Sequence, residues 1–194
     1  MIAIVDYNAG NVRSVLNALH RMGAEAEVTA DPAVLRKADR VIFPGVGNAK
    51  PAMQNLKEKG LDKVLLELTQ PFLGICLGMQ LMCSHSEEGD TACLDIFPER
   101  VKHFEADKRI PHMGWNELVE MKGQLFEGLD DRSNVYFVHS YFAEVGADTS
   151  AKSEYGIPFT AALQRDNYYG VQFHPEKSGE VGAQILSNFL KINL

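Results

Sequence analysis

Cys76 is the residue whose surroundings point most directly to chemistry. It stands in Gly74-Ile75-Cys76-Leu77-Gly78, between an apolar run typical of a buried strand and a pattern typical of a helix. This is the setting of a nucleophile elbow, in which small residues two positions to either side let the strand and the helix approach closely. A sulfur at the start of a helix also lies near the positive end of the helix dipole, which favours the thiolate. We therefore predict that Cys76 is a nucleophile; an inert core cysteine is the alternative.

His174 and Glu176 could supply the proton transfer that a thiolate nucleophile needs. His174 stands at the end of the strand-like run 169–173, directly after Phe173, and Glu176 follows two positions later. Alternate residues of an extended chain point to the same side, and Pro175 fixes φ between the two. The carboxylate could then accept from one imidazole nitrogen and leave the other facing the sulfur. Alone, such a pair is more often a solvated strand end; together with a nucleophile elbow it predicts a Cys–His–Glu triad.

Both segments resemble the two signatures of the class I, triad-type glutamine amidotransferases. The matching stretches are 74–80 (Gly-Ile-Cys-Leu-Gly-Met-Gln) and 170–176 (Gly-Val-Gln-Phe-His-Pro-Glu). The resemblance implies hydrolysis of L-glutamine through a thioester on Cys76, with no cofactor and no metal.

An oxyanion hole is expected beside the nucleophile. One donor should be the backbone N–H of Leu77, the residue after Cys76. The other should come from the segment 44–47 (Pro-Gly-Val-Gly), at Val46 or Gly47, where glycines permit unusual peptide orientations. A plain strand-to-helix turn is the alternative for this segment.

Four further segments resemble one subfamily, the glutaminase subunit of imidazole glycerol phosphate synthase from histidine biosynthesis. They are 5–11, 44–47, 111–116 (Pro-His-Met-Gly-Trp-Asn) and 177–179. This likeness implies a heterodimer with a cyclase subunit that uses the ammonia to make imidazole glycerol phosphate and AICAR. An amidotransferase of another pathway, a non-catalytic regulatory relative and a cysteine peptidase are the other readings.

The resemblance also implies roles for individual residues. Glutamine would be held by Gly47, Gln80, Ser140 and Tyr141. The cyclase interface would include Asn11, Trp115, Tyr136 and Lys177. Trp115 stands in a polar Gly-Trp-Asn stretch, which we interpret as a turn that exposes the ring as an anchor. Residues 91–98 depart from the subfamily's usual glycine-rich turn, so the backbone after the active-site helix is expected to differ.

The elements that must position these residues alternate between strands and helices in the first half of the chain. Strands are predicted at 2–5, 25–29, 40–43 and 71–75, and helices at 12–22, between 51 and 68, and at 77–85. The second half predicts closely spaced strands at 135–138, 142–145, 159–163 and 169–173, then a helix at 178–190. We expect an α/β fold: a three-layer sandwich whose mostly parallel central sheet has an antiparallel extension. The resemblance implies the flavodoxin-like variant of this fold.

Composition narrows the class of protein. The 194 residues carry a net charge of −7 with both signs interspersed, which disfavours nucleic acid and anionic membranes as partners. The three cysteines lack framework spacing, so we expect free thiols in a reducing compartment, with Cys83 and Cys93 structural. No apolar run approaches the ~20 residues of a membrane span. These features predict a single amidotransferase domain over 1–194 in the cytoplasm.

Overall fold

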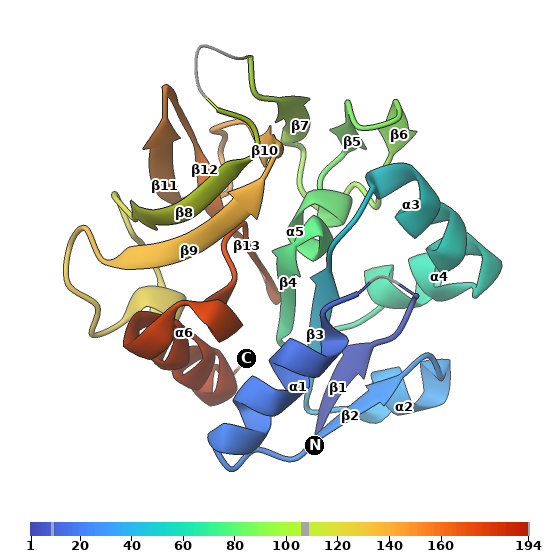
Figure 1. The fold of residues 1–194 in the computed structure, drawn as a ribbon. Coiled ribbons are helices and arrows are strands. Elements are labelled where there is room, and N and C mark those ends of the chain that lie inside the picture. Colours follow the sequence, from blue (N-terminus) through green and yellow to red (C-terminus); the bar gives the residue numbers. More distant parts are fainter. Residues whose placement is uncertain (9, 106–108, 194) are drawn as a thin grey trace.

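The computed structural model describes residues 1–8, 10–105 and 109–193, and its centre is a large mixed β-sheet (Figure 1). Parallel strands in the order β2-β1-β3-β4-β13 form one half of this sheet. They are β1 (Ile2–Val5), β2 (Ala26–Thr29), β3 (Arg40–Gly45), β4 (Phe72–Cys76) and β13 (Tyr168–Val171). Sheets with this strand order bind ligands beyond the carboxyl ends of the strands, which is where Cys76 lies.

The other half of the sheet is largely antiparallel. From β13 it continues through β12, β10 and β7 to the short pair β5 and β6, with β11 on the free side of β12. The bounds are β5 (His85–Ser86), β6 (Thr91–Ala92), β7 (Arg100–His103), β10 (Tyr141–Ala143), β11 (Thr149–Tyr155) and β12 (Ile157–Arg165). The mixed α/β fold with a parallel core and an antiparallel extension is therefore confirmed.

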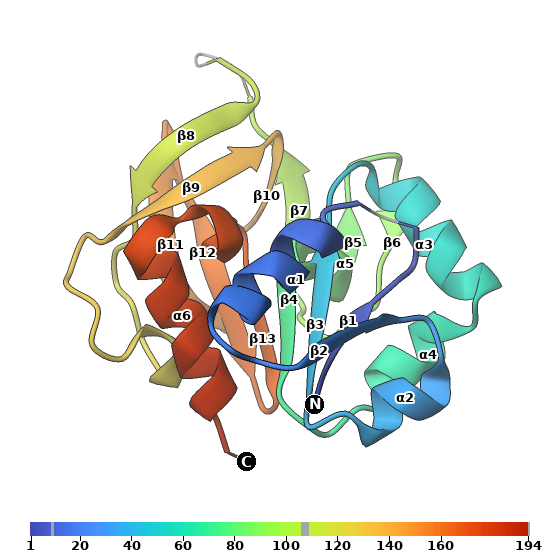
Figure 2. The same cartoon turned by 60° about the horizontal axis from the view of Figure 1, so that its bottom comes forward.

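A separate two-stranded antiparallel sheet lies over β11 and β12 (Figures 1 and 2). It consists of β8 (His112–Glu117) and β9 (Asn134–His139), paired from His112↔His139 to Glu117↔Asn134. Phe137 of β9 packs edge-on against Phe159 of β12, with ring centroids 5.6 Å apart. This ribbon brings the carboxyl end of β9 to the same edge of the molecule as Cys76.

Helices cover both faces of the parallel strands because the strand residues alternate between two cores. Ile4 and Ile42 pack with α1 (Val12–Arg21) and α6 (Gly179–Lys191), the two helices in front of the sheet in Figure 2. Val5 and Phe43 pack on the opposite face. That face is covered by α2 (Pro32–Lys37), α3 (Ala49–Glu58), α4 (Leu61–Leu66) and α5 (Leu77–Met82). Each fully buried large apolar side chain contributes roughly 1.5–3 kcal/mol to folding.

The helix predicted at 77–85 is shorter than expected. It ends at Met82, because the stretch 91–98 folds back and donates backbone N–H groups to the carbonyls of its last turn. Leu94 donates to Leu81 at 2.9 Å and Ile96 donates to Met82 at 2.9 Å. The stretch 91–98, which departs from the subfamily's usual turn, thus caps the C-terminal end of the helix that follows the nucleophile.

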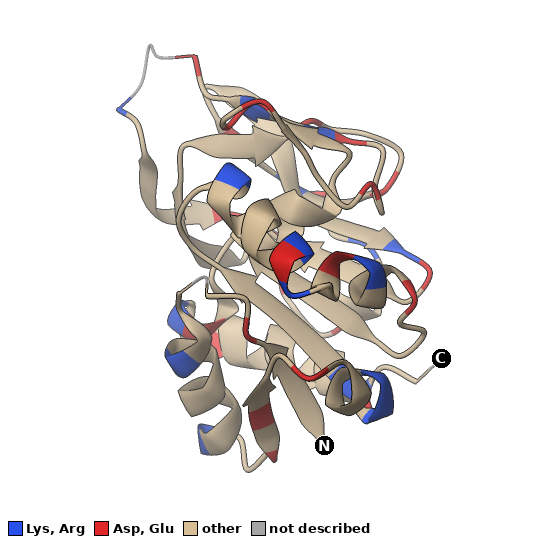
Figure 3. Ribbon diagram, turned by 90° about the vertical axis from the view of Figure 1, so that its right-hand side faces the viewer, with Lys and Arg blue, Asp and Glu red and all other residues tan. Residues whose placement is uncertain are grey.

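Several strands were not predicted, namely β5 and β6 just before the middle of the chain and β7, β8 and β11 in its second half. The predicted strand at 142–145 begins and ends earlier, at Tyr141–Ala143. The interpretation of Trp115 as part of a turn is wrong, since it lies within β8. Acidic and basic residues are intermixed over the elements (Figure 3). Among the described residues, no helix is both long and apolar enough to cross a membrane.

Candidate active site

Cys76 occupies the sharp turn between β4 and α5 that the sequence predicted. Its backbone has φ 54° and ψ −110°, a conformation that costs a residue with a side chain about 1–3 kcal/mol. The flanking glycines are required by close contacts rather than by flexibility. A Cβ on Gly78 would lie 1.8 Å from the Phe43 carbonyl oxygen, and one on Gly74 would lie 2.4 Å from the Met82 sulfur. The strand and helix are therefore pressed together around the sulfur.

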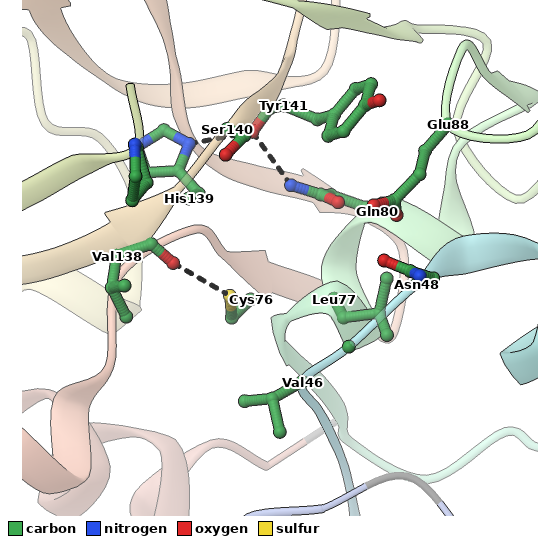
Figure 4. A pocket seen from close by; sticks show the side chains of 12 residues that line it. Val46, Asn48, Cys76, Leu77, Gln80, Glu88, Val138, His139, Ser140 and Tyr141 are labelled. Carbon is green, nitrogen blue, oxygen red and sulfur yellow. Dashed lines mark hydrogen bonds between the residues drawn. The ribbon is translucent and has the colours of Figure 1, made fainter. Parts of the chain in front are cut away.

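The Cys76 sulfur is nearly buried and has polar neighbours. The side chain amide of Gln172 donates to Sγ at 3.6 Å. The Val138 carbonyl oxygen lies 3.9 Å from Sγ, a contact that Figure 4 shows. Gln80 donates to the Oε1 of Gln172 at 2.8 Å, which fixes the Gln172 amide with its N–H toward the sulfur. The sulfur thus lies within reach of a donor, the Gln172 amide, and of an acceptor, the Val138 carbonyl. Gln172 was not singled out as a site residue from the sequence.

His174 and Glu176 form a buried pair. His174 Nδ1 lies 2.8 Å from Glu176 Oε1, and both side chains are fully buried. Burial disfavours the charged imidazole, but the Cys76 sulfur and the Glu176 carboxylate more than offset this and raise the pKa of His174 to about 10. Glu176 reaches the ring through the 3-10 helix η2 (Pro175–Lys177), not through an extended chain as was expected from the sequence.

Asn11 is the third residue of this cluster. Its Nδ2 donates to Glu176 Oε1 and lies 3.5 Å from His174 Nδ1. The resemblance had implied only a place near the partner interface for Asn11. In the structure its side chain donates a hydrogen bond to the triad carboxylate, which lies 165 positions later in the sequence.

A cavity of about 390 Å³ opens beside Cys76 (Figure 4). Its size suits an amino acid, and it includes every residue that was expected to bind glutamine or to form the oxyanion hole. Those residues are Val46, Gly47, Leu77, Gln80, Ser140 and Tyr141. The structure therefore brings together groups from the segment after β3, from α5 and from the β9–β10 connection, which are up to about a hundred positions apart.

Gln80 is fixed inside this cavity. It is only 4% exposed, and its Nε2 donates to the Tyr141 carbonyl at 2.9 Å and to Gln172 Oε1 at 2.8 Å. Both hydrogens of the amide are therefore used within the protein. The group that Gln80 can offer to a ligand is its Oε1 oxygen.

Glu88 is a cavity residue that had no role assigned from the sequence. It follows β5, and its Oε2 accepts from the backbone N–H of Ala49, at the start of α3, at 2.7 Å. Burial raises the pKa of Glu88, while the Ala49 bond acts in the opposite direction. In the sequence, Glu87 and Glu88 stand just before the departing stretch 91–98 and resemble the same subfamily, but this likeness alone assigned no role to Glu88.

The segment 44–47 lies directly beside the nucleophile, because Gly45 pairs with Cys76 in the parallel sheet. Tyr7 is fully buried and donates its hydroxyl to the Pro44 carbonyl at 2.9 Å. A Cβ on Gly45 would lie 2.2 Å from that hydroxyl oxygen, so Gly45 leaves the space that Tyr7 fills. Three residues after the Pro44 carbonyl that Tyr7 holds, Gly47 has a φ of 108°, a value that favours glycine.

An exposed aromatic residue, Trp115, lies near η2. Trp115 is 57% exposed and faces Tyr136 across the β8–β9 ribbon, with ring centroids 6.1 Å apart. Met113, two positions earlier on the same face of β8, is 62% exposed. Lys177 is exposed at the end of η2. The exposure expected of the Trp115 ring is present, although a strand rather than a turn provides it.

The family model for class I glutamine amidotransferases matches residues 3–193 of this chain. Solved structures give the same fold at low identity. A putative GMP synthase component from Thermoplasma acidophilum has a TM-score of 0.77 at 22% identity, covering 97% of this chain and 91% of that one. PurLQS from Thermotoga maritima has a TM-score of 0.72 at 17% identity, covering 97% and 96%. The chain belongs to the class I glutamine amidotransferase family.

Curated relatives of much higher identity share one name within that family. A Bacteroides fragilis (strain YCH46) protein is 54% identical over 194 residues, covering 98% of this chain and 99% of its own length. A Xanthomonas axonopodis pv. citri protein is 49% identical over 195 residues, covering 99% and 98%. Both are named imidazole glycerol phosphate synthase subunit HisH.

Proposed function

We propose that this chain is the glutaminase subunit of an imidazole glycerol phosphate synthase. It hydrolyses L-glutamine to glutamate and ammonia, and a cyclase subunit uses the ammonia to make imidazole glycerol phosphate and AICAR in histidine biosynthesis. The observation that carries the proposal is the position of Cys76, on a nucleophile elbow beside the buried His174–Glu176 pair and at the wall of an amino-acid-sized cavity. The identity to HisH proteins supports the choice of pathway.

The reaction follows from the positions of these groups. The Cys76 thiolate attacks the side chain amide carbon of glutamine, and the carbonyl oxygen becomes an oxyanion. The backbone N–H of Leu77 and an N–H from Val46 or Gly47 stabilise it; each such donor contributes about 3–4 kcal/mol to the transition state. The His174 imidazolium gives its proton to the leaving nitrogen, so ammonia departs and a thioester remains.

The second half of the reaction uses the same residues. Neutral His174 takes a proton from a water molecule, and the resulting hydroxide attacks the thioester. The thiolate leaves, glutamate is released and the imidazolium is restored. In both halves of the reaction, Glu176 and Asn11 keep the imidazole oriented by their contacts at Glu176 Oε1.

Glutamine fits the cavity with its charged end toward Glu88. The carboxylate of Glu88 complements the α-ammonium group, and the Oε1 of Gln80 accepts from the same ligand. Gly47, Ser140 and Tyr141 supply the remaining contacts from two walls of the cavity. An amino-acid-sized site of this kind favours a small substrate over the peptide of a cysteine peptidase.

The cyclase partner is proposed to bind over Trp115, Tyr136 and Lys177, with Asn11 at the inner edge of the interface. Large exposed aromatic side chains are typical of such anchors. The interface would then adjoin η2, which carries the triad carboxylate. We further propose that residues 1–194 act as one amidotransferase domain, and that the free thiols reflect a cytoplasmic location.

Substitution of Cys76 by alanine tests the function. In the complex with the cyclase, Cys76→Ala should abolish glutamine-dependent synthesis and leave synthesis from added ammonium intact. Cys93→Ala is the matched control, because Cys93 lies outside the cavity, and it should preserve both activities. Full glutamine-dependent activity in Cys76→Ala would overturn the proposal.

A further inference from the structure

A buried pair of histidines, His112 and His139, adjoins the cavity, and the mechanism above does not use it; His139 is part of the cavity lining. His112 begins β8, His139 ends β9, and the two are paired directly across the ribbon. They are 3% and 6% exposed, and His112 Nδ1 lies 2.9 Å from His139 Nε2. Aromatic rings enclose them: Tyr155 stacks on His112 with centroids 4.1 Å apart, and Phe104 meets His139 edge-on at 5.2 Å.

The proton positions follow from the groups at the two ends of this pair. His139 Nδ1 lies 2.7 Å from the Tyr141 carbonyl oxygen, which only accepts, so Nδ1 carries a hydrogen. Burial lowers the pKa of His139 to about 3, hence the ring is neutral and its Nε2 is an acceptor. His112 Nδ1 must therefore be the donor of the bond between the rings.

The other end is set by Asn116. Its Oδ1 accepts from the backbone N–H of Glu117 at 2.9 Å, which fixes the orientation of the amide. Its Nδ2 donates to the Glu154 carbonyl at 2.8 Å and faces His112 Nε2 at 3.3 Å. His112 Nε2 is thus an acceptor, and both histidines carry their hydrogen on Nδ1.

The hydrogen bonds therefore run in one direction, from Asn116 through His112 and His139 to the Tyr141 carbonyl. That carbonyl also accepts from Gln80 Nε2 at 2.9 Å (Figure 4). The last acceptor of the histidine pair is thus the atom that orients Gln80 in the cavity. On the opposite face of β8 stands the exposed Trp115, because neighbouring strand residues alternate.

We propose that His112 and His139 are positioning residues for glutamine, which hold the Tyr141 carbonyl, and with it Gln80, in the geometry that binds the substrate. The pair ties the cavity wall to β8, the strand that carries Trp115. It does not touch the reacting atoms, so the chemistry at Cys76 remains available without it. This inference rests on the proposed glutaminase function.

Two substitutions of His139 separate positioning from folding. His139→Leu removes the donor to Tyr141, whereas His139→Asn places an amide N–H near the position of Nδ1. In the cyclase complex, the KM for glutamine should rise about tenfold in His139→Leu and return to within about threefold of the parent in His139→Asn, with kcat changed less than KM. The rate at which iodoacetamide alkylates Cys76 should be the same in all three proteins.

The outcomes are distinct. An unchanged KM in His139→Leu, or an equal loss of alkylation and glutamine affinity in both variants, would overturn the inference. Absence of glutamine hydrolysis in the parent complex would instead contradict the proposed function. A measurement on the parent protein needs neither variant to fold: the side chain ¹⁵N shifts of His112 and His139 should both report neutral rings protonated on Nδ1. An imidazolium, or a ring protonated on Nε2, at either position contradicts the relay.

Discussion

His174 Nδ1 lies 2.8 Å from Glu176 Oε1 in a site where neither side chain is exposed to solvent. A buried carboxylate that has lost its hydration needs a charged or hydrogen-bonding partner. Here Glu176 receives hydrogen bonds on one oxygen from the imidazole and from Asn11. The catalytic pair is therefore also a structural pair, and its loss should be visible in stability as well as in rate.

The pH dependence of unfolding should report His174. Its pKa is raised from 6.5 to about 10 in the folded protein, so its contribution to the free energy of unfolding is fully present below 6.5 and is lost as pH rises through about 10. Denaturant unfolding at pH 7 and pH 10 should therefore show a larger loss of stability in the parent than in His174→Gln. Equal losses would mean that the imidazole carries no charge in the resting site.

Gly78→Ala tests the packing of the elbow. The new Cβ would lie 1.8 Å from the Phe43 carbonyl oxygen, so strand β3 or helix α5 must move. We expect a loss of about 1–3 kcal/mol in the free energy of unfolding and a collapse of kcat. Gly60→Ala is a control with a φ of 65° and open space around its Cβ; it should cost only about 1 kcal/mol and leave kcat unchanged.

Glu88→Gln tests how the substrate's charged end is held. Removing the negative charge while keeping the shape should raise the KM for glutamine about tenfold or more, with a smaller change in kcat. Glu87→Gln is the matched control, since Glu87 is exposed and its carboxylate accepts a hydrogen bond from the backbone N–H of His103, outside the cavity. Steady-state kinetics of the two variants decide the matter, and similar KM values for both would exclude Glu88 from the site.

Trp115→Ala tests the partner surface. We expect the affinity for the cyclase to fall by about 2 kcal/mol or more, because a large exposed ring at the centre of an interface is a typical hot spot. Leu66→Ala is the control: Leu66 is 49% exposed on α4, away from the β8–β9 ribbon. Calorimetric titration with the cyclase should show a weaker Kd for Trp115→Ala alone, and identical affinities would place the interface elsewhere.

The parallel half of the fold and the triad could be predicted because their signals are local. Each buried strand is a short apolar run bounded by turn residues, and Cys76 sits between such a run and a helical pattern. The strand β8 has no such signal, because it contains Gly114, Trp115 and Asn116, and among the described residues its pairing partner is β9 alone. Only His112 of β8 is buried, so this strand does not need an apolar alternation.

The contacts that complete the site could not be predicted for a different reason. Asn11 meets Glu176, and Gln172 meets Cys76, across 165 and 96 positions of the chain. Such partners depend on how the loops after several strands converge, which no local pattern records. Glu88 enters the cavity only because the two-residue strand β5 turns the chain back toward α3.

The hydroxyl of Tyr7 occupies the space that a side chain at position 45 would need. Because that hydroxyl also holds the Pro44 carbonyl, the peptide before Gly45 is pinned, and any reorientation of the oxyanion segment must begin after it. The two positions are thereby interdependent in sequence. A side chain at position 45 becomes tolerable only where position 7 has lost its hydroxyl, so tyrosine at one and glycine at the other should covary among relatives.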